Sequence, residues 1–320
     1  METVKLSFVI PCYGSEHTIV HVIGEILEVV SQREGYDYEI ICVNDASPDN
    51  VLEVLIKIAE NNSKVKVIDL AKNFGKHSAV MAGYSFVTGK YIINLDDDGQ
   101  CPMDRLWDLI DPLLDDKADM TTADYPKRKQ SAFKNFGSYV NSLMSMALIN
   151  KPKELRFSNF SVKKRFIIDE ILKYQNPYPY LEGLILRTTN NILPIPMEER
   201  DRYAGKGNFT FFKSLALWIN GFTAFSVKPL RMATFIGLFC SIMGFAAGVF
   251  VIIRKLIKPR IAMGYSSTMA LLLFIGGMLM LMLGMIGEYI GRIYISINNS
   301  PQYVIRNTIN INMENNHENC

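Results

Sequence analysis

The sequence predicts an α/β protein: a mostly parallel sheet with helices on both faces, followed by an interfacial helix and two transmembrane helices. Short apolar runs alternate with amphipathic stretches through roughly the first 125 residues. This alternation is expected of parallel strands joined by crossover helices. Two long runs without a charged residue follow. We therefore expect a cytosolic domain at 1–225, a two-helix transmembrane domain at 226–295, and a partly disordered cytosolic tail at 296–320.

Four strands and four helices should alternate in the first region. The strands are the apolar runs at 6–10, 38–43, 65–70 and 91–95. The helices are the amphipathic stretches at about 15–32, 49–61, 76–87 and 102–114. Further along, residues 209–225 are apolar and aromatic. They are typical of a juxtamembrane helix at the bilayer interface, with an ordinary packed helix as the alternative. The Asn-rich residues after Arg306 are expected to be disordered.

The two charge-free runs, 232–253 and 261–287, are each long enough to cross a bilayer, since a helical span needs roughly 20 apolar residues. Buried core helices are the alternative, but they are seldom so long and so uniformly apolar. Charge does not fix the orientation, because the loop at 254–260 carries four basic residues and the opposite flanks carry five. We place both termini in the cytosol because the N-terminus lacks an export signal.

Composition excludes several classes of protein. Lysine and arginine number 34 against 32 acidic residues, so the chain lacks the basic excess of a general nucleic-acid binder. An apolar content of 49% excludes a disordered protein. The five cysteines are scattered and lack Cys-x-x-Cys spacing, which argues against a disulfide scaffold or a structural zinc site.

Three strand ends carry the candidate chemistry, because ligands of such sheets bind beyond the carboxyl ends of the strands. The first strand ends in residues 11–16 (PCYGSE), the second runs into 43–49 (VNDASPD), and the fourth ends in 95–100 (LDDDGQ). An aromatic side chain, an acid and an acid cluster would then line one edge. Such an edge suits a base, a ribose and a metal-bound diphosphate.

The acid cluster is the strongest local signal. In an extended stretch Asp96 and Asp98 point the same way, and two such carboxylates repel each other unless a cation or proton intervenes. Carboxylates together with substrate phosphates suit Mg²⁺ or Mn²⁺. The alternative is a solvated acidic turn before the helix that follows Pro102. The basic segment 127–129 is either a solvated loop or a contact for an anionic substrate.

With these residues in place, the chain resembles family 2 glycosyltransferases of the GT-A fold. Within that family it is similar to the membrane-anchored polyprenyl-phosphate glycosyltransferases, such as dolichyl-phosphate mannose synthase and bactoprenol glucosyltransferase. The resemblance extends to about Arg306. It rests on Pro11-x-Tyr13 with Glu16, Asp45 with Ser47 and Asp49, Asn73-Phe74-Gly75-Lys76, Asp96-x-Asp98 with Gln100, the 202–206 loop (RYAGK), and the segments 225–231 and 287–292 beside the spans.

The resemblance implies an inverting enzyme of the hexosyltransferase type, which moves a sugar from a nucleotide sugar to polyprenyl (undecaprenyl) phosphate for cell-envelope glycans. It implies a multi-pass protein of the bacterial inner membrane, with a cytoplasmic catalytic domain, no nucleic-acid partner, and homo-oligomers. The implied donor-binding residues are Pro11, Tyr13, Glu16, Asp45, Gly75, Asp96 and Asp97. The implied ligands of Mg²⁺ or Mn²⁺ are Asp96, Asp98 and Gln100. Arg128, Arg202 and Lys206 would hold the acceptor phosphate, the last two in an acceptor loop within 200–225. The implied catalytic residues are Asp96, Asp98 and Asn159.

The chain departs from the family pattern at four positions. Gly14 replaces an Asn, Asn44 replaces the first acid of an Asp-Asp pair, and Gly207 replaces a Ser. Asn159 replaces an Asp that has been considered a base. An amide cannot accept a proton, but an acceptor phosphate with a second pKa of about 6 is already mostly ionised at neutral pH. Such an acceptor needs positioning more than deprotonation.

Three alternatives to this function remain. A processive polysaccharide synthase would carry a Gln-x-x-Arg-Trp motif and usually more spans, and the sequence has neither. A glycosyltransferase with a different acceptor fits the paired spans less well. A degenerate, non-catalytic membrane scaffold is supported only by the substitutions at Gly14, Asn159 and Gly207, and the intact Asp96/Asp98 pair argues against it.

Overall fold

A computed structural model describes residues 3–125, 155–177, 179–200, 203, 264–298 and 300–311, with single positions between 235 and 257. The chain divides into two compact units, Met1–Trp218 with Asn299–Cys320, and Ile219–Asn298. The strands that the structure describes all lie in the first unit. They are β1 (Val4–Cys12), β2 (Tyr36–Asn44), β3 (Val65–Leu70), β4 (Tyr91–Asn94), β5 (Met120–Asp124), β6 (Ser161–Lys164), β7 (Ile192–Pro196) and β8 (Ile305–Ile309).

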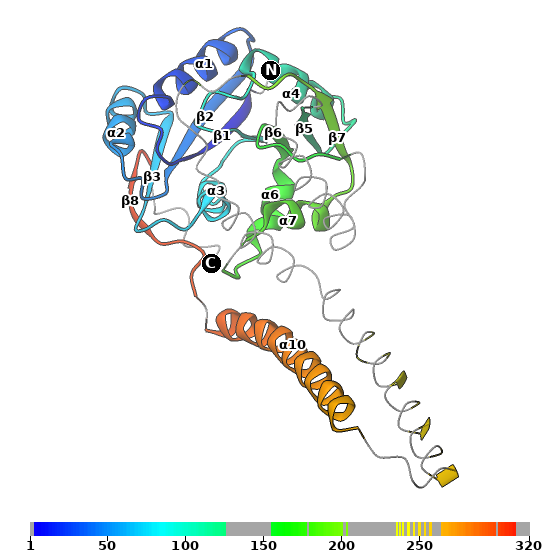
Figure 1. Cartoon of the computed structure of the whole chain (residues 1–320). Coiled ribbons are helices and arrows are strands. Elements are labelled where there is room, and N and C mark those ends of the chain that lie inside the picture. Colours follow the sequence, from blue (N-terminus) through cyan, green and yellow to red (C-terminus); the bar gives the residue numbers. More distant parts are fainter. Residues whose placement is uncertain are drawn as a thin grey trace. The chain divides into compact units, whose positions relative to one another are not determined.

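The sheet has the order β7-β5-β6-β4-β1-β2-β3-β8 (Figure 1). Among the strands that the structure describes, four of the seven neighbouring pairs are parallel and three are antiparallel. The predicted parallel sheet is confirmed at its centre, where β3, β2, β1 and β4 run in one direction. These strands are apolar on both faces, which is usual for parallel strands covered on two sides. Antiparallel strands extend the sheet on both sides, so the whole is a mixed sheet.

Helices cover both faces, and the four predicted in the first region are confirmed. Those four are α1 (Ile19–Ser31), α2 (Val51–Asn61), α3 (Lys76–Tyr84) and α4 (Leu106–Leu114), the last preceded by a short 3₁₀ turn at Met103–Arg105. Two more, α6 (Arg165–Leu172) and α7 (Leu181–Thr188), follow β6.

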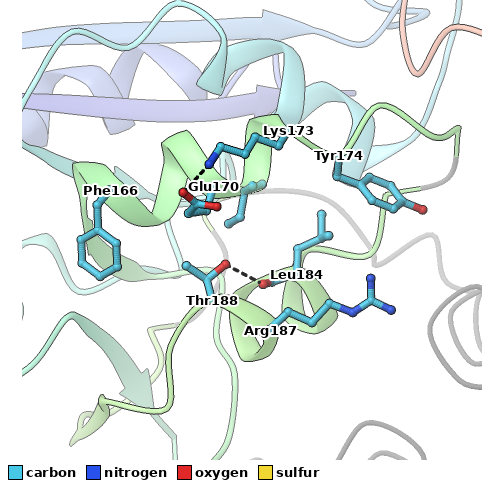
Figure 2. A pocket seen from close by; sticks show the side chains of 8 residues that line it. Phe166, Glu170, Lys173, Tyr174, Leu184, Arg187 and Thr188 are labelled. Atoms are coloured by element: carbon cyan, nitrogen blue, oxygen red, sulfur yellow. Dashed lines mark hydrogen bonds and ion pairs between the residues drawn. The ribbon is translucent and has the colours of Figure 1, made fainter.

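Helices α6 and α7 border a cavity of about 520 Å³ (Figure 2). Its lining combines apolar side chains such as Phe166 and Leu184 with the charged Lys173 and Arg187. Lys173 forms an ion pair with Glu170 at 2.5 Å across one turn of α6. None of the predicted site residues lines this cavity.

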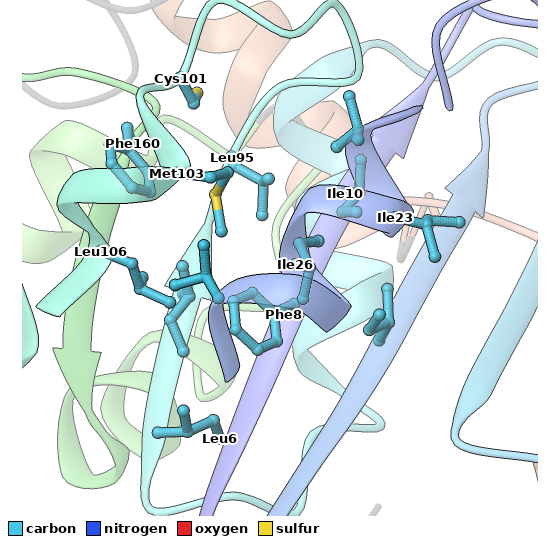
Figure 3. Packing of buried hydrophobic residues seen from close by; sticks show 14 of the residues in the cluster. Leu6, Phe8, Ile10, Ile23, Ile26, Leu95, Cys101, Met103, Leu106 and Phe160 are labelled. Atoms are coloured by element: carbon cyan, nitrogen blue, oxygen red, sulfur yellow. The ribbon is translucent and has the colours of Figure 1, made fainter. Parts of the chain in front are cut away.

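The alternation of side chains along β1 decides which helices cover which face. Leu6, Phe8 and Ile10 pack in one cluster with residues of α1, α2 and α4 (Figure 3). Val9 points to the opposite face, where α3 lies so close that a Cβ on Gly83 would come within 2.5 Å of the Val9 side chain. A residue larger than glycine at position 83 would therefore push α3 away from the centre of the sheet.

The C-terminal segment corrects one expectation. Disorder after Arg306 was expected from the asparagine content, but residues 305–309 form β8, which pairs antiparallel with β3. The side chain of Asn310 fixes the end of this strand by donating to the carbonyl oxygens of Ala59 at 2.8 Å and Val65 at 2.9 Å. Asn310 therefore holds the end of the strand in place. Residues 312–320 lie outside the described part of the chain.

The second unit contains α10 (Tyr265–Ile297), a helix of 33 residues. Within the residues that the structure describes, it is the single helix long and apolar enough to cross a membrane, at Phe274–Gly291. The predicted span at 261–287 corresponds to it. The predicted span at 232–253 falls mostly outside the described residues. Those of its positions that are described are helical, and a Cβ on Gly237 would meet Met282 of α10 at 2.5 Å. The predicted juxtamembrane helix at 209–225 lies outside the described residues.

Candidate active site

The candidate site lies where the carboxyl ends of β1, β2 and β4 meet. Because β1 lies between β2 and β4, the loops after these strands diverge, which is where open α/β sheets bind ligands. The loops after β1, β2 and β4 carry most of the predicted site residues, and α3 starts beside them.

Asp97 ties the loop after β4 to the loop after β1. Its Oδ2 accepts a hydrogen bond from the backbone N–H of Tyr13 at 3.0 Å, and its carbonyl oxygen accepts one from the hydroxyl of Thr18 at 2.5 Å. Burial raises the pKa of Asp97 to about 6, although the hydrogen bond from the N–H of Tyr13 opposes the shift. The carboxylate therefore orders the loop, and the ring of Tyr13 is left 47% exposed beside it.

Asp45 ties the loop after β2 to the start of α3. Its two carboxylate oxygens accept hydrogen bonds from the backbone N–H groups of Phe74 at 2.7 Å and Gly75 at 2.9 Å. Burial raises the pKa of Asp45, and these two donors lower it in part. Gly75 has φ +86°, a conformation that favours glycine. Asp45 and Gly75 therefore set the direction in which α3 leaves the site.

A second set of contacts joins the loops after β1 and β2. The hydroxyl of Ser47 accepts from the N–H of Gly14 at 2.7 Å and donates to Asp49 at 2.5 Å. Two further hydrogen bonds, both at 2.9 Å, connect the same loops. The N–H of Glu16 donates to the carboxylate of Asp49, and the carboxylate of Glu16 accepts from the N–H of Asn50. Glu16 thus also has an ordering contact within the site.

The departure at Asn44 has a structural reason. Its side-chain amide donates to Oδ1 of the buried Asp69 at 2.7 Å, and its side-chain oxygen accepts from the N–H of Ser47 at 3.1 Å. An aspartate at position 44 would set two carboxylates against each other in a buried place, which is costly. The amide is therefore the residue that this arrangement requires.

Asp96 lies at the centre of the candidate site. Its Oδ1 forms an ion pair with the ammonium group of Lys76, the first residue of α3. Its Oδ2 accepts a hydrogen bond from the side-chain amide of Asn159 at 2.8 Å. The structure thus brings Asp96 and Asn159 together, as expected of one site, and it adds Lys76. Lys76 belongs to the Asn73-Phe74-Gly75-Lys76 motif. Its position directly after a glycine that precedes a helix is the sequence feature that could have predicted its proximity to Asp96.

The side chains of the acid cluster are of the chemical type that binds a divalent cation. Within the described residues no group of three or more His, Cys, Asp or Glu side chains is arranged to hold a metal ion. Asp96 and Asp98 provide two hard carboxylates, which suffice when substrate phosphates complete the coordination. Oδ1 of Asp96 already faces a positive charge, that of Lys76. The side-chain amide of Gln100 donates to the carbonyl oxygen of Arg200 at 3.4 Å.

The predicted acceptor loop at 200–225 is described at Arg200 and Tyr203. Arg200 forms ion pairs with Glu25 at 2.9 Å and with Asp104. The N–H of Tyr203 donates to the carbonyl oxygen of Asp98 at 3.2 Å, and a Cβ on Gly99 would lie 2.1 Å from the Tyr203 ring. Tyr203 therefore lies against the end of the acid cluster. The three predicted phosphate ligands, Arg128, Arg202 and Lys206, lie outside the described residues.

Known proteins match both parts of the chain. Residues 7–173 match Glycosyl transferase family 2, and residues 228–293 match the GtrB C-terminal hairpin. The SfII prophage-derived bactoprenol glucosyl transferase of Shigella flexneri is 30% identical over 94% of this chain and 97% of its own length. The uncharacterized glycosyltransferase YkcC of Bacillus subtilis is 30% identical over 96% of this chain and 95% of its own.

Solved structures share the fold at low identity. Mannosyl-3-phosphoglycerate synthase from Rubrobacter xylanophilus has a TM-score of 0.53 at 16% identity, covering 72% of this chain and 75% of its own. Glucosyl-3-phosphoglycerate synthase from Mycobacterium tuberculosis, in complex with Mn²⁺ and UDP-glucose, has a TM-score of 0.51 at 18% identity, covering 67% and 75%. Because the family match covers more than half of the chain and the relatives span nearly all of it, the chain is a glycosyltransferase that belongs to family 2.

Proposed function

We propose that this glycosyltransferase is membrane-bound and moves a sugar from a nucleotide sugar to polyprenyl phosphate. The observation that carries the proposal is the match of both parts of the chain at once. Relatives named bactoprenol glucosyl transferase align over the catalytic unit and the hairpin together. Helix α10 contributes a segment of the length and hydropathy of a membrane span. An acceptor that is itself a membrane lipid would explain why such a segment accompanies the catalytic unit.

The donor would bind along the edge formed by the loops after β1, β2 and β4. The half-exposed ring of Tyr13 would contact the nucleobase, flanked by Pro11 at the end of β1 and by Glu16 in the loop that follows. Asp45 and Gly75 would face the ribose side, with Asp45 holding the backbone. Asp96 and Asp98, with Gln100, would hold Mg²⁺ or Mn²⁺. Such a cation stabilises a departing diphosphate.

The transfer would displace a nucleoside diphosphate. An oxygen of the acceptor phosphate attacks the anomeric carbon from the opposite side, and the bond from that carbon to the diphosphate breaks with its electron pair. The configuration at the anomeric carbon is thereby inverted. No protein base is needed, because a phosphate monoester with a second pKa of about 6 is ionised at neutral pH. Arg128, Arg202 and Lys206 are the cations proposed to hold this phosphate, and Asn159 orients Asp96.

The proposed location is the bacterial inner membrane, with two spans and the catalytic unit in the cytoplasm. The hairpin match at 228–293 supports two spans, and nucleotide sugars are cytoplasmic donors. Homo-oligomers are proposed on family resemblance. The product would feed the synthesis or modification of cell-envelope glycans.

A donor panel tests the proposal. Full-length protein in detergent is incubated with polyprenyl phosphate, Mn²⁺ and each of several UDP- and GDP-sugars, and the lipid is analysed by mass spectrometry. We expect one donor to yield polyprenyl phosphate carrying a single sugar. Transfer to water or to a soluble sugar acceptor, with the lipid unchanged throughout the panel, would contradict the assigned acceptor.

A further inference from the structure

The backbone of Lys76 is held in place within the candidate site. Lys76 is the first residue of α3, and the two residues before it, Phe74 and Gly75, donate their N–H groups to the carboxylate of Asp45. Its backbone is therefore held against the loop after β2. Only its side chain, four flexible carbons with an ammonium group, can change its partner.

The ammonium group of Lys76 occupies a position on Asp96 that a metal cation could also occupy. It pairs with Oδ1, while the neutral amide of Asn159 donates to Oδ2. The side chain of Lys76 is 42% exposed and that of Asp96 24%. Ion pairs this exposed are weak, so Asp96 can exchange this partner for another cation.

We propose that Lys76 is the resident counter-ion of Asp96 when the donor is absent, and that it moves to the donor's diphosphate when a divalent cation binds Asp96. This inference rests on the proposed function. A divalent cation and an ammonium group on one carboxylate repel each other. A diphosphate bound to that cation would bring anionic oxygens to the site, which could pair with the ammonium group of Lys76. Lys76 would then offset negative charge on the departing nucleoside diphosphate.

Asn159 keeps Asp96 in place during this exchange. Its amide holds Oδ2 at 2.8 Å, so the carboxylate keeps its orientation when Lys76 leaves Oδ1. A carboxylate at position 159 would instead add a second anion beside Asp96 and strengthen its hold on Lys76. The amide therefore suits a site in which the lysine must be released.

The first test measures Mn²⁺ binding alone. Full-length protein in detergent is titrated with Mn²⁺ without nucleotide, and free Mn²⁺ is followed by electron paramagnetic resonance. Lys76→Met should bind Mn²⁺ about three- to tenfold more tightly than wild type, because a competing positive charge is removed. Lys76→Arg, which keeps the charge, should stay close to wild type. Equal or weaker Mn²⁺ binding by Lys76→Met would overturn the proposal.

Lys72 provides the matched control for charge. It is an exposed lysine in the loop just before α3, with its ammonium group 5.0 Å from the centre of the Phe74 ring. Lys72→Met changes the net charge by the same amount, and its Mn²⁺ affinity should stay within about twofold of wild type because bulk charge is screened. If Lys72→Met and Lys76→Met bound Mn²⁺ more tightly by the same factor, net charge would be responsible. That result would overturn the proposal that Lys76 is the counter-ion of Asp96.

The second test adds a diphosphate. At saturating Mn²⁺, UDP and GDP are titrated by calorimetry, and Lys76→Met should bind the preferred nucleotide at least about threefold more weakly than wild type. The same substitution is thus expected to raise the affinity for Mn²⁺ and to lower the affinity for the nucleotide. Unchanged nucleotide affinity would overturn the movement to the diphosphate. If wild type bound Mn²⁺ but neither nucleotide, the diphosphate step and the assigned donor class would both fail, while the Mn²⁺ titration would still decide whether Lys76 competes for Asp96.

Discussion

At the scale of single residues, Asn159 occupies a position where similar enzymes often carry an aspartate, and its amide donates to Asp96. Asn159→Ala removes this hydrogen bond without adding charge. We expect a loss of about 1–3 kcal/mol in transition-state stabilisation, or roughly five- to 150-fold in kcat/KM. Steady-state kinetics on the lipid acceptor measure it, with circular dichroism as a check on folding.

Asn159→Asp should be worse than Asn159→Ala above neutral pH, because two carboxylates then face each other. At lower pH the introduced carboxyl group becomes protonated and can again donate to Asp96, so the deficit relative to Asn159→Ala should shrink as the pH falls. The ratio of the two activities across a pH series measures this. An Asn159→Asp enzyme that exceeds wild type at pH 8 would show that the site needs a base.

Lys163 is a buried cation in β6. Its ammonium group donates to Asn94 and Ser161, each at 2.8 Å, and burial lowers its pKa to about 7. A lysine with a lowered pKa binds its proton less tightly in the folded than in the unfolded chain. Its cost to stability is therefore full below pH 7, and stability recovers as the pH rises towards the unfolded pKa of about 10.4.

Lys163→Met removes this cost, so we expect the variant to unfold at a higher temperature than wild type at pH 6–7. Its advantage should shrink by up to about 1.4 kcal/mol per pH unit above pH 7, as the wild-type lysine becomes neutral. Thermal unfolding at pH 7 and pH 9 gives the comparison. An advantage that is constant with pH would show that Lys163 keeps its charge on both sides of pH 7.

At the scale of secondary structure elements, β8 links the C-terminal segment to the candidate site. Arg306 of β8 donates to Asp69 at 3.4 Å and to the carbonyl oxygen of Ala71 at 2.8 Å. Asp69 is buried and accepts from Asn44, and the side-chain oxygen of Asn44 accepts from the N–H of Ser47 in the loop after β2. A continuous series of hydrogen bonds thus runs from the edge strand to the loop after β2.

Arg306→Met should destabilise the protein, because the buried carboxylate of Asp69 loses its cation. The expected loss is on the order of 1–2 kcal/mol, since Arg306 is itself largely exposed. Lys57→Met, an exposed lysine on α2, is the charge-matched control and should unfold like wild type. Identical melting curves for the two variants would show that the Arg306–Asp69 pair contributes nothing.

The same elements show what the sequence could predict. β1 to β4 and α1 to α4 follow from local periodicity, and the parallel arrangement then brings the ends of β1, β2 and β4 to one edge. β6 and β8 depend on neighbours far along the chain, since β6 pairs with β4 and β8 with β3, and their own residues are partly polar. Side-chain pairs between loops, such as Lys76 with Asp96, depend on loop geometry that periodicity does not specify.

At the scale of the whole molecule, the account requires two spans with both termini in the cytoplasm. The segment at 254–260 then lies on the side of the cell membrane that faces away from the cytoplasm. In a variant with Cys320→Ser, Lys258→Cys should react with an impermeant thiol reagent in intact cells. Cys320 in the otherwise native chain should react only after lysis. Labelling of Cys320 in intact cells together with protection of Lys258→Cys would mean that the orientation is reversed.

The central claim is that the acid cluster after β4 directs a sugar onto a membrane lipid phosphate. The most direct measurement is the mass of the polyprenyl lipid recovered after incubation with the active nucleotide sugar, for wild type, for wild type in EDTA, and for Asp98→Asn. The account predicts a lipid heavier by one sugar with wild type alone, and an unchanged lipid in the other two, with Asp98→Asn still folded. Full conversion of the lipid by Asp98→Asn, or by wild type in EDTA, would contradict it.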